Sequence, residues 1–184
     1  MIASSLRFIV LGVLLYAIHL SPLLAQSPPA WDDPSTKGWI DAFQEVEIPS
    51  SLDNTPQKAY YLPQKGSKAQ PLIVSLHTWS GNYQQTDRLS GFVYQQGWNY
   101  IRPDFRGPNV RPEACGSAYV LSDIEDAIRF AIQHGKVDTT QIHVIGASGG
   151  GYATLMLYMN TTLSINSFSA WVPISNLEEW YWSS

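Results

Sequence analysis

The residues with the clearest chemical pattern are Gly146-Ala147-Ser148-Gly149-Gly150, which form a G-x-S-x-G sequence. An apolar run rich in β-type residues precedes them and an apolar helical stretch follows, so the serine lies at a turn from strand to helix. Such glycines permit a very sharp turn, which lifts the hydroxyl off the sheet at the positive end of the helix. The pattern predicts that Ser148 is a nucleophile. The alternative is a glycine-rich packing turn, which leaves the serine at its apex unexplained.

A second loop of interest, His77-Thr78-Trp79-Ser80-Gly81, follows directly on the apolar run 71–76. The two motifs resemble those of α/β-hydrolases, in which the loop after the third strand donates a backbone N–H to the oxyanion hole, beside the N–H of the residue after the nucleophile. We therefore expect Trp79 and Gly149 to form an oxyanion hole and His77 to order the loop. The alternative is a tight surface loop with a packed tryptophan.

Strand-like apolar runs alternate with helical patterns from residue 44 onward. The expected strands are 44–49, 58–62, 71–76, 98–102, 141–147 and 167–174, and the expected helices are 87–96, 122–134 and 149–159. Continuous apolar strands of this kind are typical of a parallel sheet that is covered on both faces. The sequence therefore predicts an α/β fold with a mostly parallel sheet and flanking helices.

Several charged residues outside these motifs are expected to have structural roles. Ser122 and Glu125 have the spacing of a capping box, which places the start of the central helix at Ser122. Asp123 is then expected on a solvated first turn, where the helix dipole favours an acid. The two arginines and the aspartate within 102–106 are expected to form a salt-bridged turn, with anion binding as the alternative.

The composition excludes several classes of protein. The 184 residues carry a net charge of −4, with 14% charged and 45% hydrophobic side chains, which excludes a disordered polyelectrolyte and argues against binding nucleic acid through a basic patch. A single cysteine excludes an internal disulfide framework. The spacing of cysteines and histidines suggests no metal site, and no dinucleotide or phosphate-binding glycine motif is present. We therefore expect no cofactor and no metal.

The N-terminal segment has the features of a secretory signal. Arg7 precedes a short apolar run, 8–20, and a small residue, Ala25, precedes the expected cleavage point. We expect residues 1–25 to be removed and the mature protein to be secreted or periplasmic, with no membrane contact afterwards. The alternative is an uncleaved signal that anchors the protein in the membrane. An irregular leader at 26–43 and a folded part at 44–184 follow.

Residues 44–176 resemble the α/β-hydrolase fold, and within it the prolyl oligopeptidase family of serine peptidases and its secreted esterase relatives. The segments that carry the resemblance are PLIVSLHTWSG (71–81), RPDFRGPN (102–109), ACGSAYVLSDIEDAI (114–128), IHVIGASGGGY (142–152) and SAWVPISNLEEW (169–180). The resemblance implies a serine hydrolase that cleaves a peptide or ester bond through an acyl-enzyme on Ser148. The alternatives are a carboxylesterase acting on acylated polysaccharide or small esters, and a non-catalytic homologue that serves as a binding module.

The sequence departs from this pattern in its catalytic triad. In this fold the serine is followed along the chain by an acid and then by a histidine. No histidine follows Ser148 here, and the only later acids are Glu178 and Glu179. We expect the acid and base to lie beyond Ser184, so that 44–184 is the N-terminal part of a catalytic domain and this fragment is inactive alone. The other histidines, His134 and His143, are expected to be structural.

Overall fold

The computed structural model describes residues 38–183; the candidate signal at 1–25 and the leader as far as residue 37 lie outside the described residues. The strands are β1 (Gln44–Pro49), β2 (Pro56–Leu62), β3 (Gln70–Leu76), β4 (Asn99–Pro103), β5 (Val137–Ala147) and β6 (Ser167–Trp171). The helices are α2 (Arg88–Gln96), α3 (Ala118–His134), α4 (Gly149–Asn160) and α5 (Leu177–Ser183), and a short 3-10 helix (Pro112–Ala114) precedes α3. No helix within 38–183 combines the length and apolarity that a membrane crossing requires.

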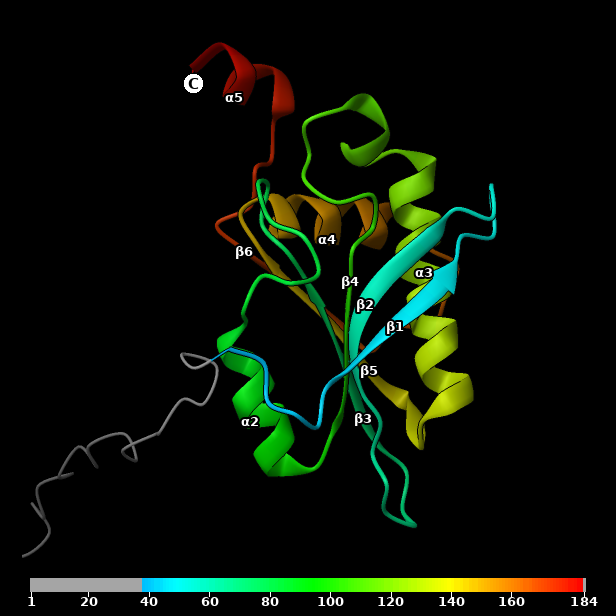
Figure 1. Cartoon of the computed structure of the whole chain (residues 1–184). Helices are drawn as coiled ribbons and strands as arrows, with labels where there is room; N and C mark the ends of the chain where they lie inside the picture. The colour runs from blue at the N-terminus through cyan, green and yellow to red at the C-terminus, as the bar shows by residue number, and fades with distance from the viewer. Residues whose placement is uncertain (1–37, 184) are drawn as a thin grey trace, which may run out of the picture. The chain divides into compact units, whose positions relative to one another are not determined.

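The strands form one open sheet in the order β1-β2-β4-β3-β5-β6 (Figure 1). β3 pairs in parallel with β4 and with β5, and β5 pairs in parallel with β6. β1 and β2 form an antiparallel hairpin that joins β4 at one side of the sheet. The predicted α/β fold with a mostly parallel sheet is confirmed.

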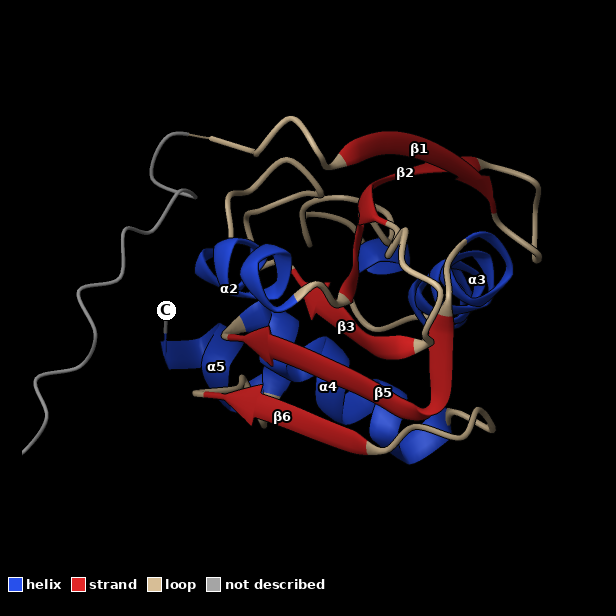
Figure 2. Cartoon of the chain, turned by 90° about the horizontal axis from the view of Figure 1, so that it is seen from below, coloured by secondary structure: helices blue, strands red, loops and turns tan. Residues whose placement is uncertain are grey.

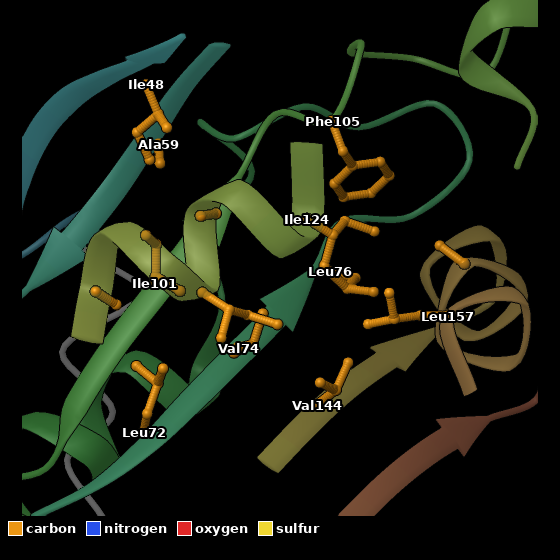
Figure 3. Packing of buried hydrophobic residues seen from close by; sticks show 14 of the residues in the cluster. Ile48, Ala59, Leu72, Val74, Leu76, Ile101, Phe105, Ile124, Val144 and Leu157 are labelled. Atoms are coloured by element: carbon orange, nitrogen blue, oxygen red, sulfur yellow. The ribbon is translucent and has the colours of Figure 1, made fainter. Parts of the chain in front are cut away.

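Alternate residues of the central strands face two different cores. Ile101 of β4 packs in a large cluster that includes Ile124 of α3 and Leu157 of α4 (Figure 3). Its neighbour Tyr100 packs in a second cluster with Val93 of α2. Because successive side chains of a strand point to opposite faces, α3 and α4 cover one face of the sheet and α2 covers the other. Figure 2 shows α2 and α3 on opposite sides of the sheet.

The observed starts of α2 and α3 differ in how closely they match the starts that the sequence predicts. Asp87 caps α2 with a side-chain oxygen that accepts from the Leu89 N–H, and Gly97 ends the helix in a left-handed conformation, as expected. The capping box expected at Ser122 is wrong, because α3 begins one turn earlier and Ser117 caps it. The first turn predicted to be solvated is therefore inside the helix, where Asp123 is buried.

The parallel strands end at one edge of the sheet, and the loops that carry the chemical motifs follow these ends. The loop 77–81 follows β3, the loop 104–109 follows β4, Ser148 follows β5 and Val172 follows β6. In open α/β sheets this edge is where ligands bind. The fold therefore brings together loops that lie far apart in the sequence.

Candidate active site

Ser148 occupies the turn between β5 and α4 in a strained backbone conformation. Its φ is 54° and its ψ is −117°, so a residue with a side chain holds the left-handed region that normally favours glycine. Such a conformation costs on the order of 1–3 kcal/mol and persists only where the surroundings impose it. Here the Ser148 N–H donates to the carbonyl of Trp171 at 3.0 Å, which ties the turn to the end of β6.

The glycines around Ser148 allow chain segments to approach one another more closely than side chains would permit. A Cβ on Gly146 would overlap the carbonyl oxygen of Gly150, so the strand and the first turn of α4 are in direct backbone contact. A Cβ on Gly149 would overlap the backbone nitrogen of Trp79 and lie 2.6 Å from its Cα. The close approach at Gly149 therefore places the two predicted oxyanion donors next to each other.

The direction of the Trp79 N–H follows from the bonds of the preceding carbonyl. The oxygen of Thr78 accepts from the Gly81 N–H at 3.0 Å and lies 2.9 Å from Nδ1 of His77. Since a trans peptide points its N–H away from its C=O, the Trp79 N–H is directed away from these partners. As the first residue of α4, Gly149 also has an N–H without an acceptor inside the helix. The backbone N–H groups of Trp79 and Gly149 thus lie close together next to Ser148.

His77 is buried beneath the loop 77–81, and both of its ring nitrogens face backbone carbonyls, so its ring is not placed to act as a base toward Ser148. The side chain is fully buried, its ring stacks on Phe105 at 3.8 Å, and its Nε2 lies 2.8 Å from the carbonyl oxygen of Asp104. Burial lowers the pKa of His77, while its contacts with the carbonyls of Thr78 and Asp104 act in the opposite direction. The structure therefore places His77 where it orders the loop 77–81.

The loop 104–109 supports the loop 77–81 through backbone bonds. The Asn109 N–H donates to the carbonyl of Trp79 at 2.8 Å, and the Asp104 carbonyl faces His77. Phe105 and Arg106 have φ values of 33° and 80°, so the loop holds two consecutive strained residues. Strain of this kind requires strong anchoring from neighbouring elements.

Arg106 provides this anchoring through partners outside the turn 102–106, which were not predicted from the sequence. Its Nε donates to Asp123 of α3 at 2.7 Å, its Nη1 donates to Asp53 at 2.8 Å, and its Nη2 donates to Ser50 at 2.9 Å. The guanidinium also stacks over the ring of Tyr119 at 4.6 Å. The expected salt bridge within the turn 102–106 is wrong, because the partners of Arg106 lie 17 and 53 residues away in the sequence.

The second arginine of that turn also pairs outside it. Arg102 lies 3.4 Å from a carboxylate oxygen of Asp87 at the start of α2 and donates to Ser75 and Gln85. Asp104 instead accepts from the Tyr83 N–H at 3.1 Å. Both arginines thus have protein partners at their terminal nitrogens, and only the buried Nε of Arg102 has no hydrogen-bond partner among the described residues. These protein partners argue against the alternative of an anion site.

A shallow hollow of about 420 Å³ opens beside Ser148. It is lined by residues 172–176 and by Glu179, Trp180 and Ser183 of α5. The centroid of the Trp180 ring lies 4.7 Å from that of Trp79, so aromatic groups flank this side of Ser148. The helix α5 was not expected from the sequence. The strand predicted at 167–174 is also shorter than expected and ends at Trp171.

The two other histidines of the described residues lie far from Ser148. His143 precedes it by five positions on β5, roughly 16 Å along an extended strand, and bonds to Ser167. His134 ends α3 just before β5 begins, so it lies at the opposite end of β5 from Ser148. Within the described residues, no cluster of three or more potential metal ligands occurs. The described site thus brings Ser148 together with the backbone of Trp79 and Gly149, while the three described histidines have other contacts.

Comparisons with known proteins agree with this geometry. The BD-FAE family model matches residues 59–172. The acylamino-acid-releasing enzyme 1 of Oryza sativa subsp. japonica is 28% identical over 135 residues, which are 66% of this chain and 17% of that enzyme. The chain therefore spans about a sixth of the length of this curated relative.

Solved structures show the same fold at lower sequence identity. A puromycin-hydrolyzing peptidase of Mycobacterium tuberculosis has a TM-score of 0.60 at 17% identity, over 78% of this chain and 24% of the peptidase. The Pyrococcus horikoshii acylaminoacyl peptidase has a TM-score of 0.54 at 18% identity, over 70% and 24% of the two chains. A thermostable esterase has a TM-score of 0.56 at 18% identity, over 68% and 40%. The chain belongs to the BD-FAE family and is a prolyl oligopeptidase-like member of the α/β-hydrolases.

Proposed function

We propose that this protein is a serine hydrolase that cleaves an ester or peptide bond through an acyl-enzyme on Ser148. The observation that carries the proposal is the strained turn at Ser148, which lies at the N-terminus of α4 with the backbone of Trp79 in contact with Gly149. A packing turn needs glycines but gains nothing from a strained serine. Backbone strain of this kind concentrates at functional sites.

In the proposed reaction, Oγ of Ser148 attacks the carbonyl carbon of the substrate and its proton passes to a general base. The carbonyl oxygen becomes negative and accepts hydrogen bonds from the N–H groups of Trp79 and Gly149. Collapse of this intermediate expels an alcohol or amine, which takes the proton from the base. Water then hydrolyses the ester on Ser148 by the same route in reverse.

The general base of this reaction is proposed to lie outside residues 38–183. Both ring nitrogens of His77 face carbonyls, and His134 and His143 are too far from Ser148. A serine hydroxyl without a base is a weak nucleophile at neutral pH. We therefore propose that sequence beyond Ser184 supplies the acid and the base, and that residues 38–183 alone are inactive. Reading the gene past codon 184 tests this, because a stop codon there would contradict it.

The relatives support both bond types. One named relative releases acylated amino acids and one solved structure hydrolyses puromycin, whereas another is an esterase. The hollow beside Ser148 is shallow, so the described residues leave room for either an alcohol or an amine as the leaving group. The bond type is therefore best decided by assay.

The test is hydrolysis by the natural, full-length protein of two panels, p-nitrophenyl esters and N-acylated amino-acid anilides. We expect turnover of at least one panel, and we expect Ser148→Ala to abolish it. Ser164→Ala, an exposed serine outside the loops that carry the site, is the matched control and should retain full activity. No turnover of either panel by the wild-type protein, or equal turnover by Ser148→Ala, would refute the proposal and favour a non-catalytic binding module.

A further inference from the structure

Gln85 bonds to the loop 77–81 at two points. Its Oε1 accepts from the backbone N–H of Thr78 at 3.0 Å, and its Nε2 donates to the Thr78 hydroxyl at 2.9 Å. The same Oε1 accepts from Nη2 of Arg102 at 2.8 Å. Because a backbone N–H and a guanidinium can only donate, these partners fix which end of the amide carries the oxygen. Gln85 therefore has one orientation in which all three bonds form.

Arg102 in turn is anchored to the sheet and to α2. Its side chain is only 5% exposed, its Nη1 donates to Ser75 of β3 at 2.7 Å, and it pairs with Asp87, the cap of α2. Asp87 also accepts from the hydroxyl of Tyr100 at 2.7 Å. Gln85 is thus held by rigid elements on one side and bonds to a loop on the other. Side chains that are locked in this way orient their partners well.

The fit between Gln85 and the loop leaves no spare room. A Cβ on Gly81 would lie 2.6 Å from Oε1 of Gln85 and 3.3 Å from the Cβ of His77. A side chain at position 81 would therefore displace the amide or the imidazole. The Gly81 N–H also donates to the Thr78 carbonyl. Gly81 therefore holds the carbonyl of Thr78, while Gln85 holds its N–H and its hydroxyl.

We propose that Gln85, held by Arg102, is a positioning residue that fixes Thr78 so that the following N–H, that of Trp79, points at the substrate oxyanion. This inference rests on the proposed function. Gln85 itself touches no reacting atom, and its effect passes through the Thr78–Trp79 peptide. Losing it should weaken binding of the transition state more than binding of the substrate, because the negative charge develops only in the transition state.

The test compares Gln85→Met with Gln84→Met, a control at the exposed neighbouring glutamine, in the full-length protein. We expect Gln85→Met to lower kcat for p-nitrophenyl acetate by about 10- to 100-fold while KM changes by less than about twofold. Amide hydrogen exchange at Trp79 should become faster in the same variant. Gln84→Met should change none of these quantities.

A second variant guards against a folding defect. Thr78→Val keeps the shape of the side chain and removes only the hydroxyl that Gln85 binds, and we expect kcat to fall about threefold. A folded Gln85→Met protein with wild-type kcat, or with the loss entirely in KM, would overturn the inference. If the wild-type protein shows no hydrolysis that depends on Ser148, the proposed function fails instead. Unchanged exchange at Trp79 in Gln85→Met would then still overturn the positioning role.

Discussion

Replacing Arg106 with methionine removes the cation that anchors the loop 104–109. The side chain of Arg106 is 8% exposed and that of Asp123 is fully buried, and their Nε–Oδ2 distance is 2.7 Å. Methionine preserves most of the apolar stem and leaves the Asp123 carboxyl without its charged partner. The strained residues Phe105 and Arg106 lose their anchor at the same time.

The expected cost follows from the burial of this pair. Removing one partner of a buried ion pair destabilises a protein by about 3–5 kcal/mol. We expect the lower end, about 3 kcal/mol or about 150-fold in the unfolding equilibrium, because Asp123 can take up a proton when its partner is gone. Burial already raises the pKa of Asp123 in the wild-type protein. In the variant, stability should therefore be lost as pH rises from about 4, the unfolded value, through the raised folded pKa.

Urea unfolding followed by tryptophan fluorescence measures this effect at pH 5 and pH 7. The matched control is Lys58→Met, since Lys58 and Glu45 form an ion pair of the same 2.7 Å length with side chains 48% and 41% exposed. That control should change stability little, because exposed pairs contribute little. The double variant Arg106→Met/Asp123→Leu should regain much of the loss. Equal effects of Arg106→Met and Lys58→Met would refute the reasoning from burial.

Two further predictions concern the loop 77–81. Gly149→Ala should lower kcat at least about 100-fold, because its Cβ would push the Trp79 backbone away and disturb both proposed oxyanion donors. The control is Gly66→Ala, where the atom nearest to the added Cβ is 3.6 Å away. Equal kcat values for the two variants would contradict the prediction. For His77, the lowered pKa means that the unfolded state binds more protons just below about pH 6.5, so wild-type stability should fall as pH drops from 7 to 5. His77→Gln should reduce that fall in urea unfolding, and an unchanged pH slope would count against the burial of a neutral ring.

The turn at Ser148 and most strand positions were predictable because their signals are local, although β5 begins four residues before its predicted start at 141. Glycines at fixed offsets from a serine, between an apolar strand and an apolar helix, describe a sharp turn whatever the rest of the chain does. β1 begins and ends at its predicted bounds, and β3 differs from its predicted bounds by one residue. Asp87 and Gly97 bracket α2 because capping depends on neighbouring residues only.

The residues that hold the site together could not be found in this way. From its neighbours in the sequence, Asp123 is expected to be solvated. Its partner Arg106 lies 17 residues earlier in the chain and contacts it only in the folded structure. The start of α3 was misplaced for a related reason: Ser117 caps it, whereas Ser122 contacts Ser51 from the β1–β2 turn. Gln85 belongs to no motif, and its proposed role depends on three hydrogen bonds to two residues, Thr78 and Arg102, from separate segments of the chain.

The proposed role of Ser148 as the nucleophile is tested by covalent labelling of the natural protein with a serine-reactive fluorophosphonate, followed by peptide mass spectrometry. We expect one adduct, on the peptide that contains Ser148, and its loss in Ser148→Ala. A folded wild-type protein that is unlabelled, or that carries its adduct on another serine, would contradict the claim that Ser148 is the nucleophile.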